Sequence, residues 1–367
     1  MFQRQPAYYR DFQCIGSACH DNCCIGWEID IDADSYERYL RQEGFIGQRL
    51  RQYISVEEYP HFILQEGERC PFLNAENLCD LIIELGEESL CNICMEHPRF
   101  YNCFGDYREA GLGLCCEEAV RCMLADSDPL RFELIETNEA ATEYSDEELW
   151  NILYPLREVM FSILQNRGYD LKERLWVLLT LAEQAQYALD EQIPMDWESF
   201  RAYYADAAHW QVLLPSDQSD MVSSSDRRCF YKEVLHCYQG LEILDPDWLK
   251  MLKAMEQRGE QVLEEMSSFE KVCHERLYVY EHFMVYLIYR YVLQAVWDGD
   301  VFSKVAFAVL SCCFLQWMDV LSWLDGSFTE DRQMEHIKNY SKEIEYSTEN
   351  IEKLEQFLYD KNVRDGL

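Results

Sequence analysis

Nine cysteines in the first third of the chain have the spacing of metal ligands. They are Cys14, Cys19, Cys23, Cys24, Cys70, Cys79, Cys91, Cys94 and Cys116. Thiolates are soft donors that select zinc, copper(I) or iron–sulfur clusters. Where two cysteines lie only a few residues apart, as Cys91 and Cys94 do, one turn of backbone can present both sulfurs to a single centre. The pattern therefore predicts metal or redox chemistry in this part of the chain.

The number of thiols bears on which metal they hold. A structural zinc site uses four ligands, usually from two C-x2-C pairs, and among these cysteines only Cys91 and Cys94 have that form. The surplus of thiols favours an iron–sulfur cluster, whose 4Fe–4S form takes four thiolates, or more than one metal. Zinc remains the alternative. A further interpretation is that most of these cysteines are buried structural residues.

A few other residues are candidates for binding. Arg99 lies soon after Cys94, where it would either meet a cofactor or another anionic ligand, or pair with a surface acid. Asp30 and Asp32 alternate with apolar residues and form either a polar strand face or the edge of a ligand site. Aromatic residues recur at helical spacing over 280–291. We expect ordinary core packing there rather than an aromatic cage for an alkylammonium ion.

Composition limits the class of protein. The 367 residues carry 32 Lys and Arg against 68 Asp and Glu, a formal net charge of −36. A surface this acidic repels nucleic-acid phosphates and anionic lipid, and it favours a cationic partner such as a lysine-bearing protein. Residues 1–6 contain no apolar signal segment, so the seventeen cysteines are expected to stay reduced in the cytoplasm.

The uneven distribution of cysteines predicts two domains, since twelve of the seventeen precede residue 123. We expect an irregular cysteine-rich metal-binding domain over 1–125, an acidic connector over 126–147 and an all-α helical domain over 148–367. Apolar residues spaced three and four apart predict the helices of the last domain. The clearest helical stretches are 171–189, 229–244, 247–266, 270–297 and 301–324. The fold class is therefore predicted as mostly α.

The stretch 305–324 is the only candidate for a membrane span. It contains Gln316 and Asp319, and its uninterrupted apolar run falls short of the ~20 residues that a bilayer requires. We therefore expect a buried helix of a bundle and no membrane association. Cys312 and Cys313 within it are expected to be small apolar core residues.

In its first 122 residues the sequence resembles the flagellin lysine-N-methylase family, a branch of a wider set of cysteine-cluster proteins described as zinc- or iron-chelating. The matching blocks follow one another in order. They are Cys14-x-Gly16-Ser17-Ala18-Cys19-x3-Cys23-Cys24-Ile25-Gly26-Trp27, residues 30–39, Cys70-Pro71-Phe72-Leu73, Cys79, Glu84-Leu85-Gly86-Glu87-Glu88-x-Leu90-Cys91-x2-Cys94, Pro98-Arg99 and Cys116-x-Glu118-Ala119. The chain departs from the family pattern at His97, Cys115 and Glu117, where Tyr, Ser and Pro are common. The helical remainder carries no diagnostic motif.

The resemblance implies a cytoplasmic enzyme that transfers methyl groups from S-adenosylmethionine to lysine ε-amines of flagellin. It also implies an iron–sulfur cluster held by the cysteine region. Methylation requires a neutral amine, so such an enzyme is expected to desolvate the lysine ammonium and lower its pKa. The sequence assigns no catalytic residue and gives no oligomeric state.

A non-catalytic role uses the same cysteines. In that interpretation the chain is a zinc- or iron-binding module that serves as a structural, interaction or redox-sensing protein, and the helical region is an interaction platform. The two functions differ in one clear way, because a module of this kind does not bind S-adenosylmethionine.

Overall fold

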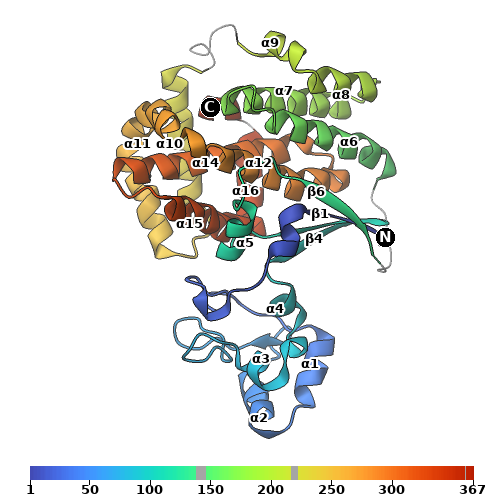
Figure 1. Cartoon of the computed structure of the whole chain (residues 1–367), viewed down its shortest axis with the longest axis vertical. Helices are drawn as coiled ribbons and strands as arrows, with labels where there is room; N and C mark the ends of the chain where they lie inside the picture. Colours follow the sequence, from blue (N-terminus) through green and yellow to red (C-terminus); the bar gives the residue numbers. More distant parts are fainter. Residues whose placement is uncertain (138–145, 216–221, 360) are drawn as a thin grey trace. The chain divides into compact units, whose positions relative to one another are not determined.

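The computed structural model describes residues 1–137, 146–215, 222–359 and 361–367. They form two compact units, both drawn in Figure 1. The unit that we call the helical unit comprises Met1–Ala7, Asn102–Glu109 and Met123–Leu367. The unit that we call the cysteine-rich unit comprises Tyr8–Tyr101 and Ala110–Cys122. The chain passes between them more than once, whereas the sequence-based ranges divide it at a single connector.

Helices form most of the helical unit. They are α6 (Glu147–Leu164), α7 (Leu171–Asp190), α8 (Trp197–Ala205), α9 (Trp210–Leu213), α10 (Ser224–Gln239), α11 (Pro246–Val272), α12 (Tyr278–Tyr291), α13 (Ala295–Asp298), α14 (Val301–Leu324), α15 (Glu330–Tyr340) and α16 (Thr348–Tyr359). This agrees with the prediction of a mostly α fold. Residues 138–145 of the predicted connector lie outside the described residues.

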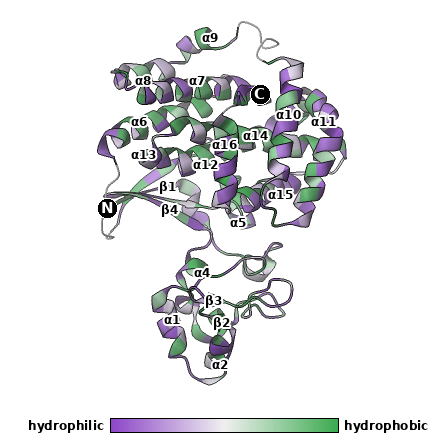
Figure 2. Ribbon diagram, turned by 180° about the vertical axis from the view of Figure 1, so that it is seen from behind, coloured by the Kyte–Doolittle hydropathy of each residue, from purple (hydrophilic) through white to green (hydrophobic). Residues whose placement is uncertain are grey.

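Helix α14 is the centre of the helical unit. It packs against α7, α11, α12, α15 and α16. Figure 2 shows hydrophobic residues along α14, whereas α11 carries both hydrophobic and hydrophilic residues. Of the described helices, α14 alone is long and apolar enough to cross a membrane, and that apolar stretch is wholly buried within the protein. The expectation of a buried bundle helix is confirmed. Cys312 and Cys313, at 0% and 2% exposed, are core residues as predicted.

Several helix starts are fixed by side chains that satisfy free backbone N–H groups. At α7, Asp170 and Glu173 form a capping box, each side chain bonding the other's backbone. At α11, the Asp245 side chain accepts from the N–H of Asp247, and Pro246 occupies the first turn, where its missing N–H costs nothing. Such caps fix where these helices begin.

A four-stranded sheet was missed by the sequence analysis. Its order is β4 (Arg99–Phe104), β5 (Tyr107–Leu112), β1 (Phe2–Pro6) and β6 (Phe132–Glu136). Strand β1 pairs parallel with β5 and antiparallel with β6. The sequence predicted an irregular region over 1–125 and not these strands, because the polar residues Gln3, Arg4 and Gln5 are all buried in β1. They hide the apolar–polar alternation that marks a half-buried strand.

Buried charges in the helical unit are paired. Both oxygens of Glu109 accept hydrogen bonds from Arg157, and both side chains are fully buried. Glu281, also buried, accepts from Arg167 and Arg174. Since an isolated buried charge costs several kcal/mol or more, this pairing is what allows so many charged groups inside the bundle.

The cysteine-rich unit has short elements by comparison. They are α1 (Ala33–Leu40), α2 (Gly44–Tyr53), β2 (Ile54–Ser55), β3 (His61–Phe62), α3 (Asp80–Leu85), α4 (Asn92–Glu96) and most of α5 (Glu117–Met123). Its apolar core is built around Tyr39, Leu50, Phe62 and Phe72. Tyr39 stacks on Phe62, and Phe62 contacts Phe72 with ring centroids 5.1 Å apart. Because its helices and strands are short, little regular backbone hydrogen bonding supports the loops that carry the cysteines.

Candidate functional site

Five of the predicted ligands lie around the core of the cysteine-rich unit. This core cysteine set consists of Cys24, Cys70, Cys79, Cys91 and Cys94. Cys70 and Cys91 are buried and the other three are half-buried. The backbone N–H of Cys70 donates to the carbonyl of Cys24 at 2.8 Å, which joins two segments far apart in sequence. Cys79 and Cys91 immediately precede α3 and α4, so helix starts hold both.

Burial and close contacts between thiols shift the pKa values of the core cysteine set. A hydrogen bond with Cys91, then burial, raises the pKa of Cys94, and the same bond lowers the pKa of Cys91. A hydrogen bond with Cys23, then burial, raises the pKa of Cys24. Burial raises the pKa of Cys70 to about 11. Most of these thiols are therefore protonated at neutral pH, and a metal must displace their protons.

Four other predicted ligands form a loop cysteine set, which consists of Cys14, Cys19, Cys23 and Cys116. Cys14 and Cys23 are exposed and the other two are half-buried. The N–H of Gly16 donates to the sulfur of Cys14 at 3.4 Å. Burial raises the pKa of Cys19 to about 12, and the charges of Cys116 and Cys23 contribute. Cys19 therefore interacts electrostatically with Cys23 and Cys116, and Cys116 interacts with Cys23 and Cys14.

One side-chain clasp holds the two segments of the loop cysteine set together. The backbone N–H of His20 donates to Glu117 Oε2 at 3.0 Å, and His20 Nδ1 lies 3.3 Å from Glu117 Oε1. His20 follows Cys19, and Glu117 follows Cys116, so the clasp fixes these two cysteines side by side. Among the residues that the structure describes, no three Cys, His, Asp or Glu side chains already stand in a metal-binding arrangement.

The remaining early cysteines belong to neither set. Cys115 and Cys122 are buried and Cys103 is half-buried. The Cys122 thiol donates a hydrogen bond to Glu118 Oε1 at 3.7 Å. Burial raises the pKa of this thiol to about 11. All seventeen cysteines of the chain are free thiols.

Arg99, the predicted cofactor contact, packs against aromatic rings. Its guanidinium carbon lies 5.4 Å from the ring centroid of Phe12 and 5.9 Å from that of Tyr9. Its Nη1 donates to the carbonyl of Met95 at 3.5 Å. Arg99 follows soon after α4, the short helix that contains Cys94, and a cofactor role for it stays a prediction.

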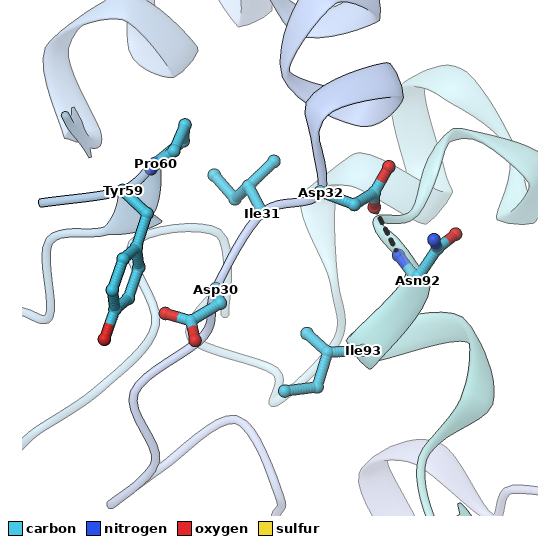
Figure 3. Close-up of a pocket in the computed structure, with 7 residues that line it drawn as sticks. All are labelled: Asp30, Ile31, Asp32, Tyr59, Pro60, Asn92 and Ile93. Carbon is cyan, nitrogen blue, oxygen red and sulfur yellow. Dashed lines mark hydrogen bonds between the residues drawn. The ribbon is translucent and has the colours of Figure 1, made fainter. Parts of the chain in front are cut away.

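A pocket of about 360 Å³ lies beside the core cysteine set (Figure 3). Its lining residues are Asp30, Ile31, Asp32, Tyr59, Pro60, Asn92 and Ile93. Figure 3 shows the Asp30 carboxylate and the Tyr59 ring on one side and Ile93 across from them. Asn92 and Ile93 are the two residues between Cys91 and Cys94, so the pocket borders that loop.

The two carboxylates of the pocket differ in their bonding. Asp32 caps α1 by accepting from the N–H of Ser35, and its other oxygen accepts from the N–H of Asn92, both at 2.9 Å. Burial works to raise the pKa of Asp32, but these N–H groups outweigh it and the pKa is lowered. Asp30 is exposed. The pocket therefore has two carboxylates, an apolar floor and no cationic lining residue, which suits a cationic ligand with an aliphatic stem.

Comparison with known proteins shows the family of the chain. The sequence model of the FliB lysine N-methylase C-terminal domain matches residues 157–366, more than half of the chain. The chain belongs to the FliB lysine N-methylase family. No solved structure shows significant similarity to it. The resemblance carried by the cysteine motifs of the first 122 residues is thus joined by a family match over the helical region, where the sequence offered no motif.

Relatives that match part of the chain have similar names, and their sequence identity to the chain is low. The chain is 29% identical over 140 residues to lysine-N-methylases of Salmonella choleraesuis strain SC-B67 and Salmonella typhimurium strain LT2. Each alignment covers 34% of this chain and 33% of the relative. Flagellar biosynthetic protein FliU of Salmonella muenchen is 28% identical over 137 residues, 34% of this chain and 79% of that protein. The chain thus spans about a third of the length of the lysine-N-methylases that it matches.

The aromatic stripe of this FliB-family protein is part of its core. Tyr280 donates to Asp319 at 2.6 Å, and Tyr291 donates to Glu345 at 2.9 Å. The cation that lies over ring faces nearby is the chain's own Arg290, whose guanidinium carbon is 5.4 Å from the Tyr291 centroid. Core packing, as predicted, accounts for these rings.

Sequence reasoning found part of the pocket. Asp30 and Asp32 were recognised as a possible ligand edge because they alternate with apolar residues. Tyr59 and Pro60 come from a different loop and carry no pattern that points to a site. The hydrogen bond from the N–H of Asn92 to Asp32, across 60 positions of sequence, is what brings the remaining wall to them.

Proposed function

We propose that this protein is an S-adenosylmethionine-dependent protein-lysine N-methyltransferase that acts on flagellin in the cytoplasm. The observation that carries the proposal is the family match over residues 157–366. The names of the relatives, lysine-N-methylase and flagellar biosynthetic protein, support the reaction and the substrate. The net charge of −36 supports a lysine-bearing partner, because long-range attraction favours a cationic segment.

The pocket beside the core cysteine set is where a substrate lysine docks. Ile31, Pro60 and Ile93 offer apolar contacts to the methylene stem, and the Asp30 carboxylate faces the ammonium. Tyr59 and Ile93 are 56% and 48% exposed, so the pocket is open on one side. An enclosed cofactor usually has most of its surface buried, whereas an open pocket accepts a side chain that is still attached to a protein.

Methyl transfer requires that the lysine lose its proton before it attacks the methyl carbon. The lone pair of the neutral amine then forms the new carbon–nitrogen bond as the bond from carbon to the sulfonium sulfur breaks. Partial desolvation against Ile31, Pro60 and Ile93 lowers the pKa of the ammonium, whereas the facing Asp30 carboxylate raises it, so the neutral fraction of the amine is what reacts. The open side of the pocket lets the released proton pass to water.

The donor set of the cysteine-rich unit fits an iron–sulfur cluster, because nine thiols of the required softness lie in two neighbouring sets. A cluster ligated by three thiolates would leave one iron to hold the amino and carboxylate groups of S-adenosylmethionine. Arg99 lies in the same unit and would meet an anionic group of the cofactor.

A labelled-methyl assay tests the proposal. Anaerobically purified protein is incubated with methyl-labelled S-adenosylmethionine and flagellin, and label on lysine is measured by peptide mass spectrometry. Asp30→Asn should raise the KM for flagellin about tenfold, the loss of about 1.4 kcal/mol of binding. Glu37→Gln removes the same charge from α1 outside the pocket, and its KM should stay within about twofold.

Two results would contradict the proposal. If metal-loaded protein transfers no label and does not bind S-adenosylmethionine in a calorimetric titration, the chain is a non-catalytic metal module. If Asp30→Asn and Glu37→Gln raise the KM equally, the effect is one of general surface charge, and lysine docks elsewhere.

A further inference from the structure

A group of stacked aromatic rings in the helical unit joins the β4–β5 turn to α6 and α13, which pack against each other (Figure 2). Phe104, at the end of β4, stacks on Trp297 of α13, with ring centroids 4.8 Å apart and ring planes 16° apart. It also contacts Trp150 of α6 at 5.1 Å. Trp150 stacks on Tyr154 at 5.1 Å, and Tyr107 contacts both of these rings. We call these five residues the aromatic ledge.

Exposure increases across the aromatic ledge. Phe104 and Tyr107 are 1% and 8% exposed, Trp150 and Tyr154 are half-buried, and Trp297 is 55% exposed. Tryptophan is a highly buried residue on average, so this exposure is unusual for a ring held in an ordered stack. Because Phe104 covers one face of the Trp297 ring, the exposed surface belongs to the opposite face and the edges. The stack therefore holds one indole face in a fixed orientation toward solvent.

The inner part of the aromatic ledge already binds cations. The guanidinium carbons of Arg4 and Arg157 lie 5.9 Å and 5.8 Å from the Tyr154 ring centroid. Ring faces attract cations electrostatically, and tryptophan offers the strongest attraction of the aromatic side chains. The open face of Trp297 can receive a cation from outside the chain in the same way.

The exposed charged residues that border the aromatic ledge are acidic. Asp106 is exposed in the turn between β4 and β5, and Glu147 is exposed in the first turn of α6. Asp298 follows Trp297, and its side chain is 48% exposed although it pairs with Lys304 at 3.1 Å. With the net charge of −36, these carboxylates attract a cationic group and repel an anionic one such as a nucleotide.

We propose that the aromatic ledge is a docking site for a lysine- or arginine-bearing segment of the protein substrate, with one cationic side chain over the open face of Trp297. The bound segment is held there without covalent change, and its methylene stem packs on the indole ring. The inference rests on the proposed function in taking flagellin as the partner. It adds a contact in the helical unit, made by residues other than those of the lysine pocket.

Fluorine NMR of the full-length protein locates the contact. The nine tryptophans are replaced by 5-fluorotryptophan, and the signal of Trp297 is identified by its loss in Trp297→Tyr. The probe is a short peptide of alternating lysine and glycine, and the matched peptide has glutamate in place of lysine. The Trp297 signal should shift on titration with the lysine peptide and stay in place with the glutamate peptide.

Affinity measurements show how much the ring contributes. Trp297→Leu should raise the Kd of the lysine peptide about two- to fivefold, the loss of ~0.5–1 kcal/mol expected for one exposed cation–π contact. Trp297→Tyr restores a ring face and should recover most of the affinity. The control is Tyr359→Leu, which removes an 82% exposed ring from α16 and should leave the Kd unchanged. Fluorescence anisotropy of the labelled peptide at about 0.15 M salt measures each Kd.

Two outcomes overturn the proposal. One is a wild-type Trp297 signal that does not move at saturating lysine peptide, a result that does not depend on whether any variant folds. The other is an equal rise in Kd for Trp297→Leu and Tyr359→Leu, which would show general attraction to an acidic surface. Failure of the proposed function looks different, because the peptide would then still shift the Trp297 signal of a protein that transfers no methyl group.

Discussion

Cysteines of the helical unit and cysteines of the cysteine-rich unit occupy opposite environments. Cys312 and Cys313 lie buried inside α14, and this burial raises the pKa of both. The Gln316 amide donates to the Cys312 sulfur at 3.9 Å. Cys14 and Cys23 are exposed on loops, and a hydrogen bond from Cys94 lowers the pKa of Cys91. The comparison shows that residue type does not decide the role. The packing around each thiol separates the buried core cysteines from the candidate ligands.

The two units also differ in what stabilises them. The helical unit has long capped helices and paired buried charges, and α14 supplies a continuous core. In the cysteine-rich unit, α1 has 8 residues, α3 has 6 and α4 has 5. Helices this short are unstable by themselves. We therefore expect metal ligation to hold the cysteine-rich unit together, while the helical unit needs none.

Metal removal should separate the units most sharply. Chelation, with oxidative loss of any cluster, should abolish hydrogen-exchange protection in the cysteine-rich unit and leave α14 protected. The expected loss is large, because structural zinc binding contributes about 10 kcal/mol or more to the folding of small domains. Mass-resolved hydrogen exchange of metal-loaded and metal-free protein measures both regions in one sample. Retained protection around α1 and α2 after complete metal loss would refute a metal-supported unit.

Breaking a buried charge pair should destabilise the helical unit. Arg157→Ala leaves Glu109 buried without its partner, at a cost of about 3–5 kcal/mol in the free energy of unfolding. Urea unfolding monitored by circular dichroism measures this cost, and metal content should not change. The control is Arg41→Ala, whose pair with Glu37 is exposed and should contribute less than about 1 kcal/mol. Equal effects of the two substitutions would contradict the view that burial gives the first pair its importance.

Acid should weaken the cysteine-rich unit through His97. Burial lowers the pKa of His97 from 6.5 to about 4. Between these values the unfolded chain binds a proton that the folded chain does not, so stability falls as the pH falls from 6.5 to 4, by up to about 3 kcal/mol. Hydrogen exchange of residues 90–101 at pH 7 and pH 5 should show this slope, and His97→Gln should remove it.

The control for the acid effect is His236→Gln, since His236 is exposed on α10. It should leave the slope of the cysteine-rich unit unchanged. Metal loss in acid acts on wild type and variant alike, so only the difference between them reports on His97. An identical slope in wild type and His97→Gln would exclude His97 as its source.

The smallest effect should come from a core cysteine of the helical unit. Cys312→Ala removes one buried sulfur from α14 and should cost about 1 kcal/mol in the free energy of unfolding. Metal content should be that of the wild type, as determined by elemental analysis. Loss of zinc or iron from Cys312→Ala would show that the division into filler and ligand cysteines is wrong.

Patterns along the sequence predicted some of this architecture well. The period of apolar residues located α7 and α11 because each of these helices buries one face in the bundle. The long apolar run located α14, which is buried on all sides. The sheet was not predictable in the same way. Strand β1 buries Gln3 and Arg4, which bond to Arg108 and Glu158 respectively, and those partners are known only from the fold.

The candidate site was predicted in composition but not in arrangement. Short spacing identified the cysteines, yet it could not bring Cys24 to Cys70 or Cys23 to Cys116, because these approaches depend on how distant segments fold together. Of the pocket beside them, the sequence indicated only Asp30 and Asp32. Its other wall follows from a single long-range hydrogen bond, which no local pattern encodes.

Methyl transfer to flagellin by the metal-loaded protein is the most direct test of the account. Flagellin is incubated with the anaerobic protein and deuterium-labelled S-adenosylmethionine, then digested and sequenced by mass spectrometry. We expect labelled methyl groups on lysine ε-nitrogens that require the protein and fall when Asp30→Asn replaces wild type. Unlabelled lysines after incubation with fully metal-loaded wild-type protein would contradict a lysine methyltransferase and leave a metal-binding module.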